Sequence, residues 1–341
     1  MNSVAYYPGK RVIVTGGLGF IGSNLALELA RLGAKVTVID SAIEGCGANP
    51  DNLAGAPAGS IEVIQSDLGE TAHFEGRLRE VSRIFNLAGE ISHSRSMSDP
   101  ERDLTLNTIS QLRFLLACRT HCPRDTRILY ASTRQVYGKP EYLPVDEHHP
   151  IRPVDFNGVH KYASTQYHDL MARSGDLECI ILRLSNVYGP RMALHLPQQG
   201  FLGVHIRRTL LGEPIPVYGD GEQLRDPVFV EDVVRAFLSA GSAPRPSHRL
   251  YNVGGPEALS LRQIACAIAA QGRGSRVETV PFPAHLLRHD IGSYYTDNTR
   301  LREDLGISPR VLFEDGIRET VAWFRSRAPQ YLEPFGLSSA A

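Results

Sequence analysis

The sequence predicts an α/β protein built on a doubly wound parallel sheet with a smaller α+β lobe, and three observations support this prediction. Short β-branched runs alternate with longer amphipathic stretches in the first half of the chain. The runs are largely apolar, as strands buried on both faces of a parallel sheet are. The alternation loosens after residues 189–190, and 341 residues allow one large domain or two closely joined ones.

The elements of the first half follow one another as strand and helix. The predicted strands span residues 11–16, 35–40, 61–67, 83–89, 127–133 and 179–185, and the predicted helices span residues 20–32, 72–80, 101–121 and 157–174. Crossover connections between parallel strands are right-handed, so these elements predict a sheet with helices on both of its faces. We expect this main domain to cover residues 1–185.

The elements of the second half predict the smaller lobe, over residues 186–330, followed by a tail at residues 331–341. Residues 190–228 are rich in Pro, Gly and Gln. The predicted elements are a helix near 201–212, a strand at 215–219, helices at 230–240, 260–271 and 311–326, and a segment at 250–255 that returns to the main sheet. A ligand crevice between the lobes, at the carboxyl ends of the strands, is expected for this layout.

The composition excludes several classes of protein. Lys and Arg total 36 and Asp and Glu total 37, so there is no general basic surface for nucleic acid, although a local anion pocket is possible. No apolar run approaches the roughly 18 residues that span a bilayer, and no signal-peptide pattern precedes the first strand. The five cysteines are scattered without a CxxC pair, which predicts reduced thiols, no metal site and a cytoplasmic protein.

A glycine-rich loop at residues 15–22 joins the first predicted strand to the first helix. Gly16 permits a tight turn, Gly19 lets the backbone approach a pyrophosphate, and Gly22 lets the helix pack against the strand. The helix start, with its free amides and dipole, holds the anion. Asp40 ends the second strand, where a carboxylate accepts hydrogen bonds from both ribose hydroxyls and repels a 2′-phosphate. The loop therefore predicts a Rossmann-type site for NAD rather than NADP.

Two residues after the third strand have two interpretations. Asp67 and Leu68 stand where an adenine ring would be flanked. Taken alone, Asp67 is equally well explained as a helix cap.

Several strings, in order along residues 10–326, resemble the extended short-chain dehydrogenase/reductase family, and in particular its nucleotide-sugar epimerases and dehydratases. They are TGGLGFIG (15–22), NLAG (86–89), YASTRQVYG (130–138), LRLSNVYGPR (182–191), VYGDGEQLRD (217–226) and FVEDVVRAF (229–237). The resemblance implies a tightly held NAD that takes a hydride from a nucleoside-diphosphate sugar and later returns it. It also implies a homodimer through helices 101–121 and 157–174, although an amphipathic helix buried in its own domain has the same pattern.

The resemblance also assigns site residues by position. Thr133 matches the family's catalytic Ser/Thr, and Lys161 matches the lysine that holds the nicotinamide ribose and lowers the pKa of a neighbouring base. The implied cofactor site comprises Gly16, Gly19, Phe20, Ile21, Gly22, Asp40, Asp67, Leu68, Leu87, Ala88, Gly89 and Lys161. The implied substrate site comprises Glu90, His93, Asn107, Thr133, Asn186, Val217, Tyr218, Arg225 and Arg288, with the two arginines on the diphosphate.

The chain departs from the family at its general base. The family has a tyrosine four residues before the lysine, whereas this chain has Asn157, and an amide cannot exchange a proton near neutral pH. One interpretation is that His160, Glu90 or His93 does the proton work, with Tyr188 a weaker candidate.

Two other interpretations of this departure stay open. The protein can be a catalytically weak relative that binds a nucleotide sugar, or it can catalyse a reaction in which no alcohol is oxidised. The sequence favours an NAD-dependent epimerase over a dehydratase, and both over a reductase that consumes NADH.

Overall fold

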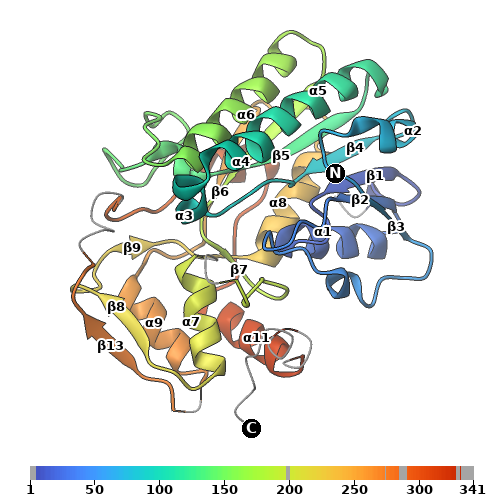
Figure 1. The fold of residues 1–341 in the computed structure, drawn as a ribbon. Coiled ribbons are helices and arrows are strands. Elements are labelled where there is room, and N and C mark those ends of the chain that lie inside the picture. The colour runs from blue at the N-terminus through green and yellow to red at the C-terminus, as the bar shows by residue number, and fades with distance from the viewer. Residues whose placement is uncertain (1–4, 197–199, 273, 284–289, 328–330, 332–341) are drawn as a thin grey trace.

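A parallel sheet of seven strands forms the centre of the larger part of the molecule (Figure 1). The computed structural model describes residues 5–196, 200–272, 274–283, 290–327 and 331. The strand order is β11-β6-β5-β4-β1-β2-β3, and all neighbouring strands are parallel. The strands are β1 (Arg11–Thr15), β2 (Lys35–Asp40), β3 (Ile61–Gln65), β4 (Arg83–Asn86), β5 (Arg127–Thr133), β6 (Glu178–Leu184) and β11 (Leu250–Val253). The predicted fold class is confirmed.

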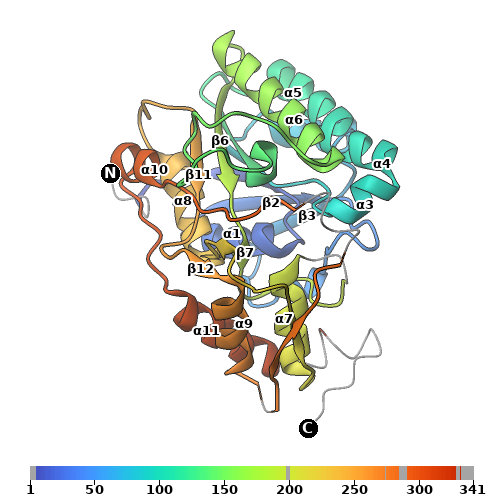
Figure 2. The same cartoon turned by 90° about the vertical axis from the view of Figure 1, so that its left-hand side faces the viewer.

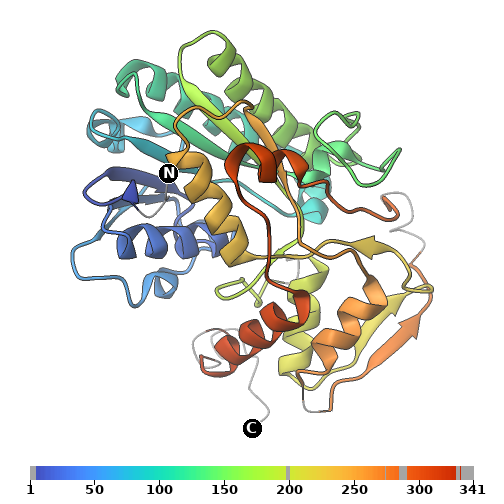
Figure 3. The same ribbon diagram turned by 180° about the vertical axis from the view of Figure 1, so that it is seen from behind.

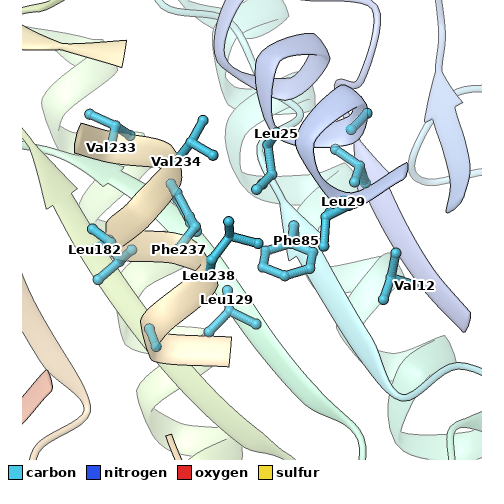
Figure 4. Close-up of a cluster of buried hydrophobic side chains, with 14 of the residues drawn as sticks. Val12, Leu25, Leu29, Phe85, Leu129, Leu182, Val233, Val234, Phe237 and Leu238 are labelled. Atoms are coloured by element: carbon cyan, nitrogen blue, oxygen red, sulfur yellow. The ribbon is translucent and has the colours of Figure 1, made fainter. Parts of the chain in front are cut away.

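Each face of the sheet has its own hydrophobic core, because successive residues of a strand point to opposite faces. Val12 and Val14 belong to the core under α1 (Phe20–Arg31), α8 (Val230–Ser242) and α10 (Thr299–Leu305). Ile13 belongs to the opposite core, under α5 (Ser110–His121) and α6 (Phe156–Arg173). Figure 3 shows the side covered by α8, and Figure 4 shows the side chains of α1 and α8 meeting those of the strands. The helices therefore cover both faces, as a doubly wound sheet requires.

The order of the strands reverses between β1 and β4, which are neighbours in the sheet. β2 and β3 extend the sheet on one side of β1, and β4, β5, β6 and β11 extend it on the other. The loops that leave β1 and β4 therefore diverge, and such a switch point leaves a crevice for a ligand. Thr15 and Asn86, the last residues of these strands, are joined there by a hydrogen bond of 2.8 Å from Thr15 Oγ1 to Asn86 Oδ1.

The smaller lobe lies beyond the carboxyl ends of the strands (Figures 1 and 2). It contains α7 (Phe201–Leu210), β8 (Ile215–Tyr218), α9 (Leu261–Ala269), β13 (Val277–Val280) and α11 (Phe313–Arg325). β8 and β13 pair in parallel, and apolar residues of α7, α9 and α11 form a core of their own against β8. Two short strand pairs link the connecting segments, namely β7 (Val187–Tyr188) with β10 (Val228–Phe229), and β9 (Leu224–Arg225) with β12 (Leu259–Ser260).

Two of the predicted helices are divided in the structure. The segment expected at 72–80 forms a 3-10 turn, η3 (Thr71–His73), and one helical turn, α2 (Glu75–Leu78). The segment expected at 101–121 forms α4 (Pro100–Leu104), a π-helical turn η4 (Thr105–Ile109) and α5. A π-helical turn adds a residue to the helix and is common at functional sites. The apolar periodicity of the sequence continues through it, so a single helix was expected.

Several elements were not predicted from the sequence, among them α3 (His93–Ser98), α10 and β13. Each of these three has seven residues or fewer, and α3 has one large apolar residue, Met97, so none has a strong periodic pattern. Among the described residues, no helix is long and apolar enough to cross a bilayer.

Candidate active site

A cavity of about 330 Å³ opens at the carboxyl ends of β1, β2, β4, β5 and β6. Its volume lies in the range of small-molecule sites. All twelve residues predicted for the cofactor line it: Gly16, Gly19, Phe20, Ile21, Gly22, Asp40, Asp67, Leu68, Leu87, Ala88, Gly89 and Lys161. The structure therefore brings the whole predicted cofactor set to one cavity at the switch point of the sheet.

The glycine loop has no room for side chains where it turns from β1 into α1. A Cβ atom on Gly22 would lie 2.2 Å from the carbonyl oxygen of Gly16, and Gly16 itself has a φ of +68°. No acidic residue occupies the first turn of α1. The loop thus presents bare backbone and a positive helix end to the cavity, which fits the pyrophosphate of a dinucleotide.

Asp40 is buried at the end of β2 and also lines the cavity. Its two carboxylate oxygens accept hydrogen bonds from the backbone amides of Leu18 and Ala42, both at 2.9 Å. Burial raises the pKa of Asp40, and the two amides oppose this effect. Each oxygen keeps a lone pair for a further donor. The residue is therefore fixed in place and still able to accept hydrogen bonds from ribose hydroxyls.

Asp67 has a structural partner as well as a place in the cavity wall. Its Oδ1 accepts hydrogen bonds from the Gly69 amide at 2.7 Å and from Ser110 Oγ at 3.1 Å. These contacts fix the turn after β3, beside Leu68. The N-cap of η3 is Glu70, so Asp67 fixes this turn and does not cap a helix. Its place in the cavity wall is compatible with the adenine interpretation.

Thr133, Lys161, Asn157 and His93 line the cavity near the ends of β4 and β5. Lys161 is buried, and its burial lowers its pKa to about 8 against the opposing charges of Asp103 and Glu90. None of the described residues accepts a hydrogen bond from its ammonium group. Lys161 is therefore a desolvated cation that is free to bind a ligand.

Gly89 is needed because two polar groups approach it closely. A Cβ atom there would lie 2.5 Å from both Lys161 Nζ and Asn107 Oδ1. Asn107 Nδ2 donates to the carbonyl of Glu90 at 3.0 Å, whereas its buried Oδ1 has no partner among the described residues. Asn107 is carried by the π-helical turn η4, which places its side chain beside the cavity wall.

Asn157 and His160, the two residues that depart from the family pattern, share one buried carboxylate. Asn157 Nδ2 donates to Asp103 Oδ2 at 2.9 Å and to the Glu90 carbonyl at 3.0 Å. Asp103 Oδ1 lies 2.7 Å from His160 Nδ1. Asp103 is only 1% exposed, and neither it nor His160 lines the cavity. The two departures thus form one hydrogen-bonded network around Asp103.

Glu90 is also kept away from the cavity. Its side chain is 3% exposed and its Oε1 accepts from the amides of Ile91 and Ser92, at 2.9 and 3.1 Å. Its Oε2 lies 3.3 Å from Arg95 Nη1 and 3.5 Å from Cys46 Sγ. The carboxylate is therefore occupied by groups of the protein.

His93 has a different environment from Glu90 and His160. Its side chain is 49% exposed, it lines the cavity, and its Nδ1 lies 2.5 Å from Asp155 Oδ2. Its Nε2 contacts the side-chain amide nitrogen of Gln135, which also lines the cavity. No other histidine among the described residues belongs to the cavity wall.

The residues predicted for the substrate are only partly brought together. Asn186 lines the cavity, and its Oδ1 accepts a hydrogen bond of 3.2 Å from Arg134 Nε. Arg225 is buried outside the lining, where its Nη1 donates to the carbonyls of Leu224 and Gly292 at 2.7 and 2.6 Å. Burial lowers its pKa to about 10.

The remaining predicted substrate residues lie further away. Val217 belongs to the core of the smaller lobe, and Tyr218 is half-exposed with its ring 5.8 Å from that of Phe282. Tyr188, the weaker base candidate, is fully buried in the same core as Val217. Arg288 lies outside the described residues.

Two carboxylates of the site were missed in the sequence, Asp103 and Asp155. Asp155 precedes a predicted helix, where an acidic residue commonly acts as N-cap, and this signal was available. Asp103 stands four residues before Asn107 and so shares its side of the helix, but only the fold brings it between Asn157 and His160.

Comparisons with known proteins agree with this site. The model of the NAD dependent epimerase/dehydratase family matches residues 12–254. The UDP-glucose 4-epimerase of Mycolicibacterium smegmatis is 35% identical over 321 residues, which cover 93% of this chain and 99% of that protein. The dTDP-glucose 4,6-dehydratase of Actinoplanes sp. is 31% identical over 328 residues, with coverage of 93% and 98%. The solved UDP-glucose 4-epimerase of Thermus thermophilus in complex with NAD is similar in structure, with a TM-score of 0.79, 31% identity and coverage of 92% and 99%.

Proposed function

Because the chain belongs to the NAD-dependent epimerase/dehydratase family, we propose that it is a nucleotide-sugar epimerase that inverts a hydroxyl-bearing carbon by oxidising and re-reducing it. One observation carries the choice of epimerase. Asp40 and Asp67 line the cavity at the ends of β2 and β3, and Cys46 lines it with a thiol whose pKa is raised by burial. The other titratable side chains of the described lining are His93 and Lys161. Epimerisation needs one group that takes a proton and returns it, whereas elimination of water needs proton transfer at two neighbouring carbons.

Thr133, at the end of β5, and His93, at the start of α3, act together on the sugar hydroxyl. Thr133 Oγ1 accepts from the Gln135 amide at 3.2 Å, so its own hydrogen is available to the substrate oxygen. His93 Nε2 accepts the hydroxyl proton and later returns it. NAD, when bound, would supply the hydride acceptor, and later the hydride donor, for the carbon that bears this hydroxyl. The oxidation thus removes one proton and one hydride, and the reduction restores both.

Lys161 and Asp40 would hold the cofactor at its two ends. Lys161 supplies a desolvated positive charge near Thr133, and Asp40 supplies a fixed carboxylate for the ribose at the other end of the cavity. The glycine loop follows β1, which lies between β2 and β4 in the sheet. This arrangement favours NAD over NADP, because a 2′-phosphate beside Asp40 would be repelled.

We propose UDP-glucose as the first substrate to examine. The support is the similarity to the UDP-glucose 4-epimerases of M. smegmatis and T. thermophilus over more than nine-tenths of the chain. Asn186, Arg225 and Arg288 would bind the sugar-nucleotide side of the substrate.

A dimer through α5 and α6 is part of the proposal. The two helices lie side by side on the same face of the sheet (Figure 1). Each exposes large apolar side chains, and those of α6 include Val159 and Leu170, at 47% and 52%. Their positions differ by eleven residues, which corresponds to about three helical turns, so both lie on one side of α6.

The experiment compares conversion of UDP-glucose to its 4-epimer by the parent and by His93→Gln. A loss of about 10²–10⁴-fold in rate with retained binding of UDP-glucose and NAD is expected. His248→Gln is the matched control, since His248 is also 49% exposed and its Nδ1 also faces a carboxylate, Asp304, at 3.2 Å. If His93→Gln is as active as His248→Gln, His93 is not the base. If the parent converts no nucleotide sugar, the protein is better described as a binding relative.

A further inference from the structure

Asp155 makes two contacts that connect helix α6 to the proposed base. It is the N-cap of α6, and its Oδ1 accepts the amide hydrogen of Gly158 at 2.7 Å. Its Oδ2 lies 2.5 Å from His93 Nδ1. The side chain of Asp155 is only 6% exposed, so water competes little for either oxygen. One carboxylate thus fixes both the start of α6 and the orientation of the His93 ring.

The contact with Asp155 determines which nitrogen of His93 carries the proton. A carboxylate accepts hydrogen bonds, so Nδ1 carries a proton, and in the neutral ring Nε2 then holds the lone pair. The contact at Nε2 agrees with this assignment, because the amide nitrogen of Gln135 can only donate. His93 therefore offers a proton acceptor on the side that faces Gln135 and the cavity.

Gln135 marks the place where a substrate hydroxyl would bind. It lies two residues after Thr133 and lines the cavity with it. Its Oε1 is buried and accepts no hydrogen bond from any described residue. One sugar hydroxyl can take the place of the Gln135 amide nitrogen at His93 Nε2. A second hydroxyl of the same sugar can then donate a hydrogen bond to Gln135 Oε1. The unpartnered oxygen is an independent sign that a polar ligand completes this corner.

We propose that Asp155 is a positioning residue, which holds His93 in the tautomer that accepts a proton at Nε2 and stabilises the imidazolium that forms. The proposal rests on the proposed function, in which His93 is the base. His93, held by Asp155 and bordered by Gln135, thereby takes over the proton transfer that Asn157 cannot perform. The N-cap contact ties this group to the helix that carries Lys161, six residues further along.

The substitution Asp155→Asn tests the proposal without removing the helix cap. Asn is as good an N-cap as Asp, so its oxygen can still accept from Gly158. Its amide nitrogen would then face His93 Nδ1 and donate to it, which moves the imidazole proton to Nε2 and abolishes the acceptor there. The matched control is Asp99→Asn, since Asp99 caps α4 by accepting a hydrogen bond of 3.2 Å from the Arg102 amide. Asp99 makes no hydrogen bond with a histidine among the described residues.

Two measurements are made on these variants. Nitrogen-15 NMR of the imidazoles, with the His93 signals assigned by their loss in His93→Gln, reports the tautomer without any turnover. We expect the Nδ1–H form in the parent and in Asp99→Asn, and the Nε2–H form in Asp155→Asn. With UDP-glucose, we expect kcat of Asp155→Asn to fall by about 10²-fold or more while KM and the melting temperature stay those of the parent.

The outcomes separate this inference from the proposed function. An Nε2–H tautomer in the parent, or an unchanged kcat in Asp155→Asn beside an inactive His93→Gln, overturns the positioning role alone. Full activity of His93→Gln overturns the choice of base. A fall in the melting temperature of Asp155→Asn with kcat unchanged would make Asp155 a helix cap and nothing more.

Discussion

Gly22→Ala should disrupt the turn that holds the dinucleotide. The added Cβ would lie 2.2 Å from the Gly16 carbonyl oxygen, 2.8 Å from the Gly16 carbonyl carbon and 2.9 Å from Gly17 Cα. Favourable contacts begin at about 3.5 Å, so the loop and α1 must separate by about 1 Å. All three atoms are backbone, so no side chain can rotate away to make room.

The expected cost of Gly22→Ala can be bounded from these contacts. Overpacking of this kind costs about 1–3 kcal/mol of folding free energy. Moving the loop amides by a similar distance should remove hydrogen bonds to the pyrophosphate worth about 1.5–3 kcal/mol, or roughly 10–100-fold in the Kd for NAD. Urea unfolding measures the first quantity and isothermal titration calorimetry the second.

Gly76→Ala is the matched control for Gly22→Ala. Gly76 also lies in a helix, α2, and an added Cβ there meets nothing within 4 Å. Alanine should stabilise that helix by about 0.5–1 kcal/mol and leave NAD binding unchanged. If Gly22→Ala binds NAD as tightly as Gly76→Ala does, the glycine loop does not hold the cofactor in the manner described.

Three further predictions concern the cofactor, the buried lysine and the dimer. The parent should bind NAD at least about tenfold more tightly than NADP, a difference of ~1.4 kcal/mol. Asp40→Asn should reduce this preference. Equal affinities of the parent for NAD and NADP in calorimetry would contradict the role of Asp40. Burial lowers the pKa of Lys161 to about 8 from 10.5, so the unfolded chain binds more protons between these values, and stability should rise with pH across that window. Urea unfolding should show a higher free energy of unfolding at pH 10 than at pH 7 in the parent, and Lys161→Met should lack this increase. An equal increase in both proteins would mean that Lys161 is exposed to water. The substitutions Val159→Glu and Leu170→Glu should convert the dimer to a monomer, as measured by analytical ultracentrifugation. The control Leu312→Glu, at a residue 49% exposed on the smaller lobe, should leave the dimer intact. A dimer that persists in the α6 variants would exclude α6 as the interface.

The sheet and the cofactor end of the site could be predicted because their signals are local. The glycine loop, Asp40 and the alternation of strands and helices are each contained within a short stretch of sequence. The family resemblance and the assignment of NAD are both confirmed by the comparisons. In a parallel sheet the carboxyl ends of the strands share one edge, so residues that follow different strands meet without further information.

The proton-transfer end of the site could not be predicted to the same degree, because its contacts join distant parts of the chain. His93 and Asp155 are 62 residues apart, and His160 and Asp103 are 57 apart. From the sequence, Glu90, His93 and His160 were equal candidates. Only the fold shows that Glu90 and His160 are buried on protein partners while His93 borders the cavity.

The smaller lobe was predicted least completely. β13 pairs with β8 across 58 residues of intervening sequence, and its four residues carry no periodic pattern. Arg225 illustrates the same limit, because a motif cannot tell whether a guanidinium faces a ligand or two backbone carbonyls.

The fate of a deuterium atom at C4 of UDP-glucose tests the central claim most directly. The deuterated substrate is incubated with the parent, with His93→Gln and with the control His248→Gln, and the products are analysed by mass spectrometry and NMR. Transient oxidation at C4 predicts the 4-epimer with the deuterium still on C4, formed by the parent and by His248→Gln but at least about 10²-fold more slowly by His93→Gln. Deuterium found on C6 would identify a dehydratase, deuterium lost to solvent would exclude hydride return, and equal rates in the two histidine variants would contradict the assigned base.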